Sequence, residues 1–214
     1  EVATKLNQKD WDERKIFTAF NGLSGTDSNL YRFNSNSSTA ALRNIIGIPA
    51  ESDTEKFIKW VSGSDVYNES PSGKPHHKLF DIYHSGLVKV GPPAGMSANS
   101  LYRKFYTKYE ERPTIIYVQS NAGMLHGFND TDEKPGQPTQ PAGDERFAFI
   151  PPNVLAGNRL RGLRWPDGGK NYDSTFSYPR YLADGPLIAE DVPLGSGDAK
   201  EYRTVLMAQL GIGG

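Results

Sequence analysis

The chain contains no cysteine among its 214 residues. This absence excludes disulfide frameworks, zinc–thiolate sites, iron–sulfur clusters and thiol nucleophiles. An excess of either charge is also missing, because 24 Lys and Arg residues are balanced by 25 Asp and Glu residues. Proteins that bind nucleic acid usually carry a strong basic excess, and proteins held on anionic membranes carry polybasic segments. We therefore expect no nucleic-acid partner.

Long apolar runs are missing as well. No run reaches the roughly 18 residues that a membrane-spanning helix needs, so an integral membrane protein is not expected. The composition still allows a packed core, because 36% of the residues are hydrophobic and 11% are aromatic. The chain is polar overall, with a mean hydropathy of −0.59. The chain begins at Glu1 without a signal-peptide pattern and ends on residues 211–214 after an apolar stretch. We expect a processed piece of a longer protein.

Residues 1–78 are predicted to form a linker-like segment with two short helices. One strand is expected over residues 15–20, before the turn-like Asn21–Gly22. The first helix, residues 39–46, is stopped by Pro49. The second begins at Ser52, where a hydroxyl followed three residues later by a glutamate fits a capping box.

Residues 79–214 read as short strands separated by turns and loops. The strongest signal is a hairpin, with strands over residues 114–119 and 124–129 joined by a Ser-Asn-Ala-Gly turn. Further strands are expected over residues 146–150, 181–183, 187–189 and 202–210, and residues 101–109 place aromatic side chains at helical spacing for packing. This pattern favours an all-β sandwich, barrel or propeller, although no strict repeat is present.

Five strings in this second part resemble, in the same order, strings of the PilY family of type IV pilus proteins. They are Asp-Ile-Tyr-His-Ser (81–85) with Val-Lys-Val-Gly (88–91), the hairpin over 112–128, Glu-Arg-Phe-Ala-Phe-Ile-Pro (145–151), Tyr-Leu-Ala-Asp-Gly-Pro-Leu (181–187), and Tyr-Arg-Thr-Val-Leu with Gly-Ile-Gly-Gly (202–214). The chain departs from the family at Gln119 and Ser120, which stand in place of Gly-Ala, at Ala122, which stands in place of Asp, and at Gly127, which stands in place of Ala.

The resemblance implies a mainly β fold with a small helical and loop part at the N-terminus. Residues 79–214 would supply two to three blades of a modified β-propeller, since a blade takes about 40–50 residues and a ring about four to eight blades. The rest of the ring would come from the same propeller or from a second chain, because open sheet edges are normally paired or covered.

The resemblance also implies a function. It points to a non-enzymatic bacterial protein, extracellular or on the cell surface at the pilus tip and associated with the outer membrane. Its work would be pilus biogenesis, twitching motility and adhesion, with pilins or minor pilins and a host or abiotic surface as partners. Two other functions stay open: a quinoprotein-like dehydrogenase, whose propellers carry similar strands, and a structural subunit of an extracellular filament.

The histidines are not expected to be catalytic. His76 and His77 lie in a charged loop without acidic partners at ligand spacing. His84 is close in sequence to Asp81 and Ser85, which suggests a triad, but no Gly-x-Ser-x-Gly elbow is present and structural hydrogen bonding is favoured. His126 is expected to be a core histidine bonded to backbone. No catalytic or cofactor-binding residue is therefore predicted.

Binding sites are the remaining expectation. Calcium is implied for the full-length family, and its only candidates here are Asn129, Asp130 and Asp132, which lack the alternating oxygen ligands and the turn glycine of a calcium loop. No cofactor is thus expected in this segment. The aromatic residues Tyr172, Phe176 and Tyr178 lie in a polar stretch and are candidates for partner binding.

Overall fold

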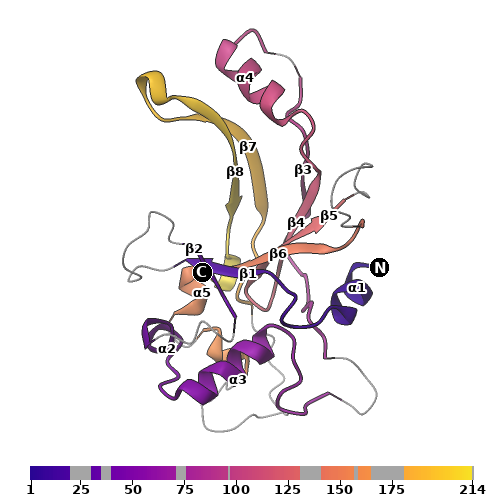
Figure 1. Ribbon diagram of the computed structural model, residues 1–214, viewed down its shortest axis with the longest axis vertical. Coiled ribbons are helices and arrows are strands. Elements are labelled where there is room, and N and C mark those ends of the chain that lie inside the picture. The colour runs from indigo at the N-terminus through magenta and orange to yellow at the C-terminus, as the bar shows by residue number, and fades with distance from the viewer. Residues whose placement is uncertain are drawn as a thin grey trace.

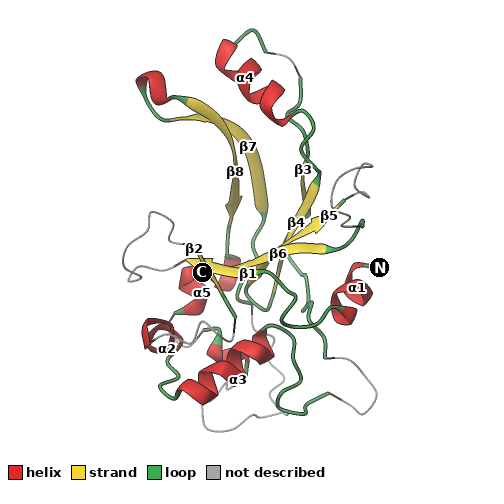
Figure 2. Ribbon diagram, viewed as in Figure 1, coloured by secondary structure: helices red, strands yellow, loops and turns green. Residues whose placement is uncertain are grey.

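The chain folds into a mixed α/β structure with two separate sheets (Figures 1 and 2). The computed structural model describes residues 1–19, 30–34, 40–70, 76–95, 97–130, 141–156, 159–164 and 181–213. In chain order the elements are α1 (Val2–Gln8), β1 (Ile16–Ala19), β2 (Leu30–Arg32), α2 (Ala40–Ile46), α3 (Glu51–Val61), β3 (Val88–Val90), α4 (Ser100–Tyr109), β4 (Ile115–Ser120), β5 (Met124–Asn129), β6 (Glu145–Ile150), α5 (Pro152–Leu155), η2 (Arg161–Leu163), β7 (Leu187–Leu194), η3 (Gly197–Ala199), β8 (Glu201–Ala208) and η4 (Gly211–Gly213).

The larger sheet has six strands in the order β2-β1-β6-β5-β4-β3. The β4–β5 hairpin is its regular centre, with Val118 opposite His126 and Ser120 opposite Met124. β1 runs parallel to β6, with Ile16 opposite Ala148, whereas the other neighbours in the sheet are antiparallel. Strands from residues 1–78 therefore share one sheet with strands from residues 79–214, and the division at residue 78 stays a prediction.

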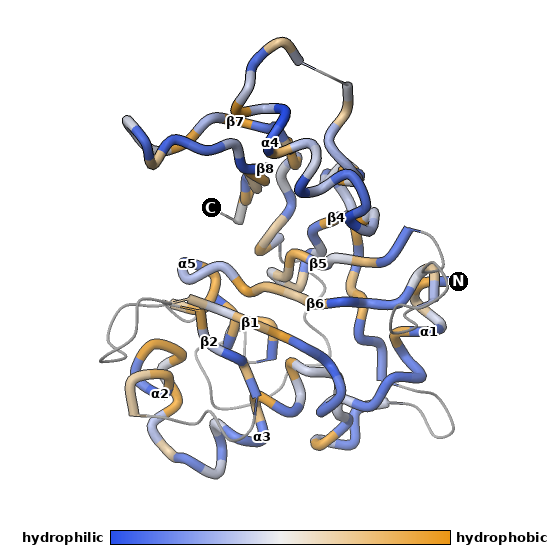
Figure 3. Tube along the Cα trace, turned by 45° about the horizontal axis from the view of Figure 1, so that its top comes forward, coloured by the Kyte–Doolittle hydropathy of each residue, from blue (hydrophilic) through white to orange (hydrophobic). Residues whose placement is uncertain are grey.

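The main core lies between this sheet and the helices below it. α2, α3 and α5 gather on one side of the sheet (Figure 1), and hydrophobic residues are concentrated in β1 and α2 (Figure 3). The fully buried members include Ile16 from β1, Ile150 from β6, Phe57 from α3 and Leu155 from α5. The opposite side of the sheet carries the half-buried Phe17, Phe147 and Phe149, which line an apolar hollow of about 570 Å³.

The smaller sheet is the long β7–β8 hairpin, which stands on the far side of the large sheet beside β3 (Figure 1). α4 packs on it through aromatic rings: the Tyr102 and Tyr202 centroids are 5.0 Å apart, and those of Phe105 and Tyr202 are 6.2 Å apart. The expectation that the aromatic residues of this helix serve packing is confirmed for Phe105, which is buried.

Most elements expected from the sequence are present, and several details differ. α3 has Ala50 at its N-cap without a side-chain cap bond, so the capping box at Ser52 is wrong. Residues 181–183 form no strand, because their backbone bonds go to the β4–β5 turn instead of a ladder. The helix α1 and the strand β2 were not predicted. Among the described residues the sheets form no closed barrel, and the arrangement as propeller blades remains a proposal.

Gly123 is required by the turn between β4 and β5. Its φ of 82° is in the left-handed region, and an added Cβ would come within 2.4 Å of Val154 Cγ1 and 3.0 Å of Leu182 Cβ. We expect Gly123→Ala to lower the free energy of unfolding by about 1–3 kcal/mol or more, through backbone strain and overpacking. Urea denaturation measures this change. Gly86→Ala is the control, since nothing lies within 4 Å of its Cβ position; equal effects at both glycines would contradict the expectation.

Candidate functional site

Residues from all five family-like strings lie close to the β4–β5 turn. The Asn121 amide donates to the Asp81 carbonyl at 2.8 Å, and the Leu182 amide donates to the Asn121 carbonyl at 3.3 Å. From the strand side, the Gln119 amide donates to Ser85 Oγ at 2.9 Å. We call residues 81–85, 119–123, 182–185 and 209–211 the motif junction. β6, from the remaining string, is hydrogen-bonded to β5 directly behind it.

Gln119 holds the base of the β7–β8 hairpin in the motif junction. Its Nε2 donates to the Gly185 carbonyl at 2.9 Å and to the Gln209 carbonyl at 2.7 Å. Gly185 leaves no room for a side chain, because a Cβ there would lie 2.3 Å from the Gln209 carbonyl oxygen. The departure from the family pattern at position 119 thus has a structural role: the longer amide joins the two sheets.

His84 is paired with Asp184, which is 100 residues away in sequence. The Asp184 carboxylate accepts the His84 amide at 3.0 Å and contacts His84 Nδ1 at 2.5 Å. The Asp184 side chain is 1% exposed and the His84 side chain 54% exposed, so a buried carboxylate holds a surface imidazole in position. The structural hydrogen bonding predicted for His84 is confirmed, although with Asp184 in place of Asp81, and Ser85 Oγ bonds to backbone instead.

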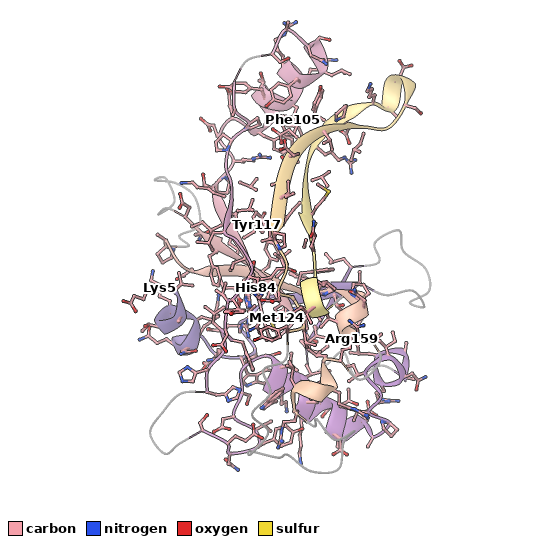
Figure 4. The ribbon with its side chains drawn as sticks, turned by 180° about the vertical axis from the view of Figure 1, so that it is seen from behind. Lys5, His84, Phe105, Tyr117, Met124 and Arg159 are labelled. Atoms are coloured by element: carbon pink, nitrogen blue, oxygen red, sulfur yellow. The ribbon has the colours of Figure 1, made fainter. Side chains whose placement is uncertain are left out.

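A cluster of aromatic rings lies at the surface of the junction. Tyr83 is 65% exposed, and its ring lies 4.1 Å from the His84 ring and 5.9 Å from the Tyr181 ring, centroid to centroid. His84 and Met124 are near the base of the β7–β8 hairpin in Figure 4. Together with Tyr181, the exposed side chains Phe80, Ile82, Tyr83, His84 and Leu87 are the junction surface. Apolar side chains gathered on a surface mark binding sites.

Beneath the junction lies a buried chain of polar groups. Ser120 Oγ is 3.0 Å from His126 Nε2, and His126 Nδ1 is 2.8 Å from Glu145 Oε1. Arg14 closes the chain with two hydrogen bonds of 2.8 Å to the two Glu145 oxygens, and a third bond of 3.1 Å to the Ser62 carbonyl at the end of α3. The sequence predicted a backbone partner for His126, and the actual partners are two side chains.

Electrostatics fix the charges in this buried network. Burial alone would raise the pKa of Glu145, but the hydrogen bonds and charge of Arg14, with the contribution of His126, hold that pKa well below its usual value. Burial lowers the pKa of His126, and this effect exceeds the opposing influence of Glu145. The network therefore contains a charged Arg14–Glu145 pair and a neutral imidazole at pH 7.

The Ser120–His126–Glu145 connectivity has the order of a nucleophile, base and acid. Ser120 and His126 are fully buried, however, and Arg14 occupies both carboxylate oxygens of Glu145. A substrate cannot reach Ser120 Oγ in this conformation. The arrangement instead suits structural fixation of the hairpin on the N-terminal segment.

The remaining predicted site residues are not brought together. Asn129 is buried at the end of β5, and Asp130 forms an ion pair of 2.5 Å with Lys89. Asp132 lies outside the described residues, as do Tyr172, Phe176 and Tyr178. In the part of the chain that the structure describes, no three His, Asp or Glu side chains gather to hold a metal ion.

His76 and His77 keep local contacts: His76 is near the Trp60 ring, where burial lowers its pKa, and His77 Nδ1 is 3.4 Å from Asn7 Nδ2. Sequence reasoning missed the roles of Arg14, Glu145 and Asp184, which no local spacing reveals.

Fold and site together define a mixed α/β protein whose sheet turns converge on one exposed junction. In comparison with known proteins, this chain is similar to proteins of the PilY family. It is 33% identical over 144 residues to the type IV pilus biogenesis factor PilY1 of Pseudomonas aeruginosa strain UCBPP-PA14, a match that covers 64% of this chain and 10% of the relative. It is 32% identical over 142 residues to a PilY1 homolog of Xylella fastidiosa strain Temecula1, covering 63% of this chain and 10% of the relative.

The chain thus spans about a tenth of the length of the curated relatives it matches. No family model matches it, and no solved structure matches it significantly. Within the described residues, no helix has the length and hydrophobicity to cross a membrane.

Proposed function

We propose that this protein takes part in type IV pilus biogenesis by binding partners through the motif junction. The observation that carries the proposal is the convergence of the PilY-like strings on one junction with a cluster of aromatic rings at its surface. The process in the proposal comes from the relatives, which are named type IV pilus biogenesis factor PilY1 and its homolog. A hydrogen-bonded junction with exposed aromatic side chains suits binding, because aromatic residues often dominate interface energies.

The finer parts of the proposal concern place and partners. We propose an extracellular position at the pilus tip, with pilins or minor pilins and a host or abiotic surface as binding partners. A non-enzymatic role is supported by the closed state of the Ser120–His126–Glu145 network, which leaves its hydroxyl inaccessible. Calcium binding by the full-length protein is proposed to use residues outside this segment.

We also propose that the sheets are blades of a larger propeller. The apolar hollow over Phe17, Phe147 and Phe149 is a sheet face without a covering layer among the described residues. Exposed apolar sheet faces are normally covered by a second layer. The rest of the propeller, or a second chain, is the proposed cover.

Replacing the aromatic pair of the junction surface tests the proposed binding role. We expect the double variant Tyr83→Ser, Tyr181→Ser of the full-length protein to bind its partners at least roughly 30-fold more weakly, since even one buried aromatic anchor contributes about 2 kcal/mol or more to an interface. In a deletion strain complemented with the variant, surface pilus counts and the twitching zone are expected to fall toward those of the deletion.

The matched control is Leu194→Ser, at the other end of the β7–β8 hairpin, where an exposed apolar side chain lies outside the junction surface. Secreted protein levels are compared first, so that loss of folding is recognised. Normal piliation and adhesion by a well-folded double variant would refute the proposed role of the junction surface.

A further inference from the structure

A groove separates the β3–β4 edge of the large sheet from the β7–β8 hairpin. It consists of two cavities of about 430 and 340 Å³, and residues Val90, Arg112 and Thr204 line both of them. The walls are strand edges: among the described residues β3 pairs only with β4, and β7 only with β8. In Figure 4, Tyr117 lies between the two sheets, and Phe105 of α4 lies at the upper end.

The larger cavity is polar, and its side chains hold one another in place. Arg112 Nε donates to the Gly91 carbonyl at 2.5 Å, and Arg112 Nη1 donates to Thr204 Oγ1 at 2.7 Å. Thr204 Oγ1 donates to Asp191 Oδ1 at 2.6 Å, and the Tyr102 hydroxyl donates to Asp191 Oδ2 at 3.3 Å. These contacts join α4, β7 and β8, so hydrogen-bonding groups converge in fixed positions on the cavity.

Most of the charges in this cavity are already paired. Lys89 Nζ lies 2.5 Å from Asp130 Oδ2, and Arg112 Nη2 lies 4.0 Å from Asp191 Oδ1. Glu190 adds one more carboxylate to the lining, so an anionic ligand is disfavoured. The lining therefore favours a ligand without negative charge that both donates and accepts hydrogen bonds.

The smaller cavity is apolar. Besides the shared residues, its lining consists of Pro113, Ile115, Tyr117 and Leu206. Burial of Tyr117 raises the pKa of its hydroxyl, which keeps the side chain neutral. A ligand that fills both cavities therefore needs a neutral polar part beside a single apolar group.

We propose that this groove binds an extended peptide segment, with one apolar side chain in the smaller cavity and its backbone amides on the Arg112–Thr204–Asp191 cluster. A peptide meets each requirement: its backbone N–H and C=O groups are neutral donors and acceptors, and a side chain supplies the apolar group. A saccharide matches the polar cavity but has no apolar group for the smaller one. The site does not depend on the pilus function proposed above.

The test uses the full-length protein and a fluorescein-labelled, end-blocked peptide, Gly-Thr-Ser-Leu-Ser-Thr-Gly. Fluorescence anisotropy is expected to show binding at least about tenfold tighter than for the same peptide with Ala in place of Leu, since three buried carbon atoms are removed. A benzophenone side chain at the Leu position is expected to crosslink to residues 112–117 or 204–206, as mapped by mass spectrometry.

Two neighbouring residues on β8 give matched variants, because successive side chains of a strand point to opposite faces. Leu206→Lys places a charge in the smaller cavity and is expected to weaken the Leu peptide at least about tenfold. Met207→Lys, on the opposite face and 52% exposed, is expected to leave binding unchanged. Asp191→Asn removes one charge at nearly constant shape and is expected to weaken both peptides.

Three results would overturn the proposal. Equal affinity for the Leu and Ala peptides would show that the smaller cavity does not bind the apolar side chain. An unchanged affinity of Leu206→Lys for the Leu peptide would show that the peptide binds elsewhere. The groove would be assigned to saccharides if maltose binds, if the Asp191→Asn variant loses maltose binding, and if the Leu peptide does not compete with maltose. Melting curves establish whether each variant is folded. If Leu206→Lys does not fold, the crosslink map and the affinity of Asp191→Asn decide whether the peptide binds in the groove.

Discussion

Replacing Arg14 with methionine is expected to lower the free energy of unfolding by about 3–5 kcal/mol, the range for leaving a buried charge without its partner. The Arg14 and Glu145 side chains are fully buried, and two bonds of 2.8 Å join them. Methionine fills a similar volume but offers no donor, so the Glu145 carboxylate would keep only His126. Urea denaturation at pH 7, followed by circular dichroism, measures the loss.

The double variant Arg14→Met, Glu145→Gln is the control for this prediction. Glutamine keeps an acceptor for His126 Nδ1 and removes the uncompensated charge, so much of the lost stability is expected to return. Equal instability of the single and double variants would show that packing around Arg14, and not its charge, accounts for the effect. A double-mutant cycle with Glu145→Gln alone gives the coupling energy.

The Arg14 contacts also explain how distant parts of the chain are held together. Its guanidinium reaches β6 through Glu145 and the end of α3 through the Ser62 carbonyl. Lys9 adds a hydrogen bond of 3.0 Å to the Glu145 carbonyl. The N-terminal segment is therefore fixed to the first residue of β6, which keeps β1 in register beside that strand.

Local features of the fold were predictable from the sequence. The β4–β5 hairpin follows from two β-rich runs around a turn that ends in glycine, and α3 follows from its apolar spacing. The parallel pairing of β1 with β6 was not predictable, because about 130 residues separate these strands and the pattern of one strand does not name its neighbour. The capping box at Ser52 failed because α3 begins earlier, at Glu51.

The candidate site was predictable in its parts but not in its assembly. The PilY-like strings identified the residues around His84, Asn121 and Asp184 separately. Their convergence depends on tertiary contacts such as the Asp184 bond to His84 and the Gln119 bonds to Gly185 and Gln209. The buried network was missed for the same reason. Arg14 and Glu145 are 131 residues apart, and the residues next to each of them give no sign of the pairing.

The buried imidazole makes stability depend on pH. The folded-state pKa of His126 is lowered, so below about pH 6.5, the ordinary histidine value, the unfolded chain takes up a proton that the folded protein excludes. The stability due to neutral His126 is complete above that pH and is expected to decline on acidification by about 1.4 kcal/mol per pH unit. Below about pH 4.3, the ordinary glutamate value, protonation of Glu145 in the unfolded state adds a second decline of the same sign.

Urea denaturation between pH 7.5 and 4.5 measures this slope, and His126→Gln separates its source. Glutamine can bond to both Ser120 and Glu145 but does not titrate, so the variant should be less stable at pH 7 and lose the slope of one proton between pH 6.5 and 4.5. His76 also has a lowered pKa through burial, but it is partly exposed, so His76→Asn should remove a smaller part of the slope. A pH dependence unchanged by His126→Gln would mean that the buried imidazole is not excluded from protonation. In that case the Arg14–Glu145 pair would have to accommodate a second buried positive charge at 2.8 Å from Glu145 Oε1.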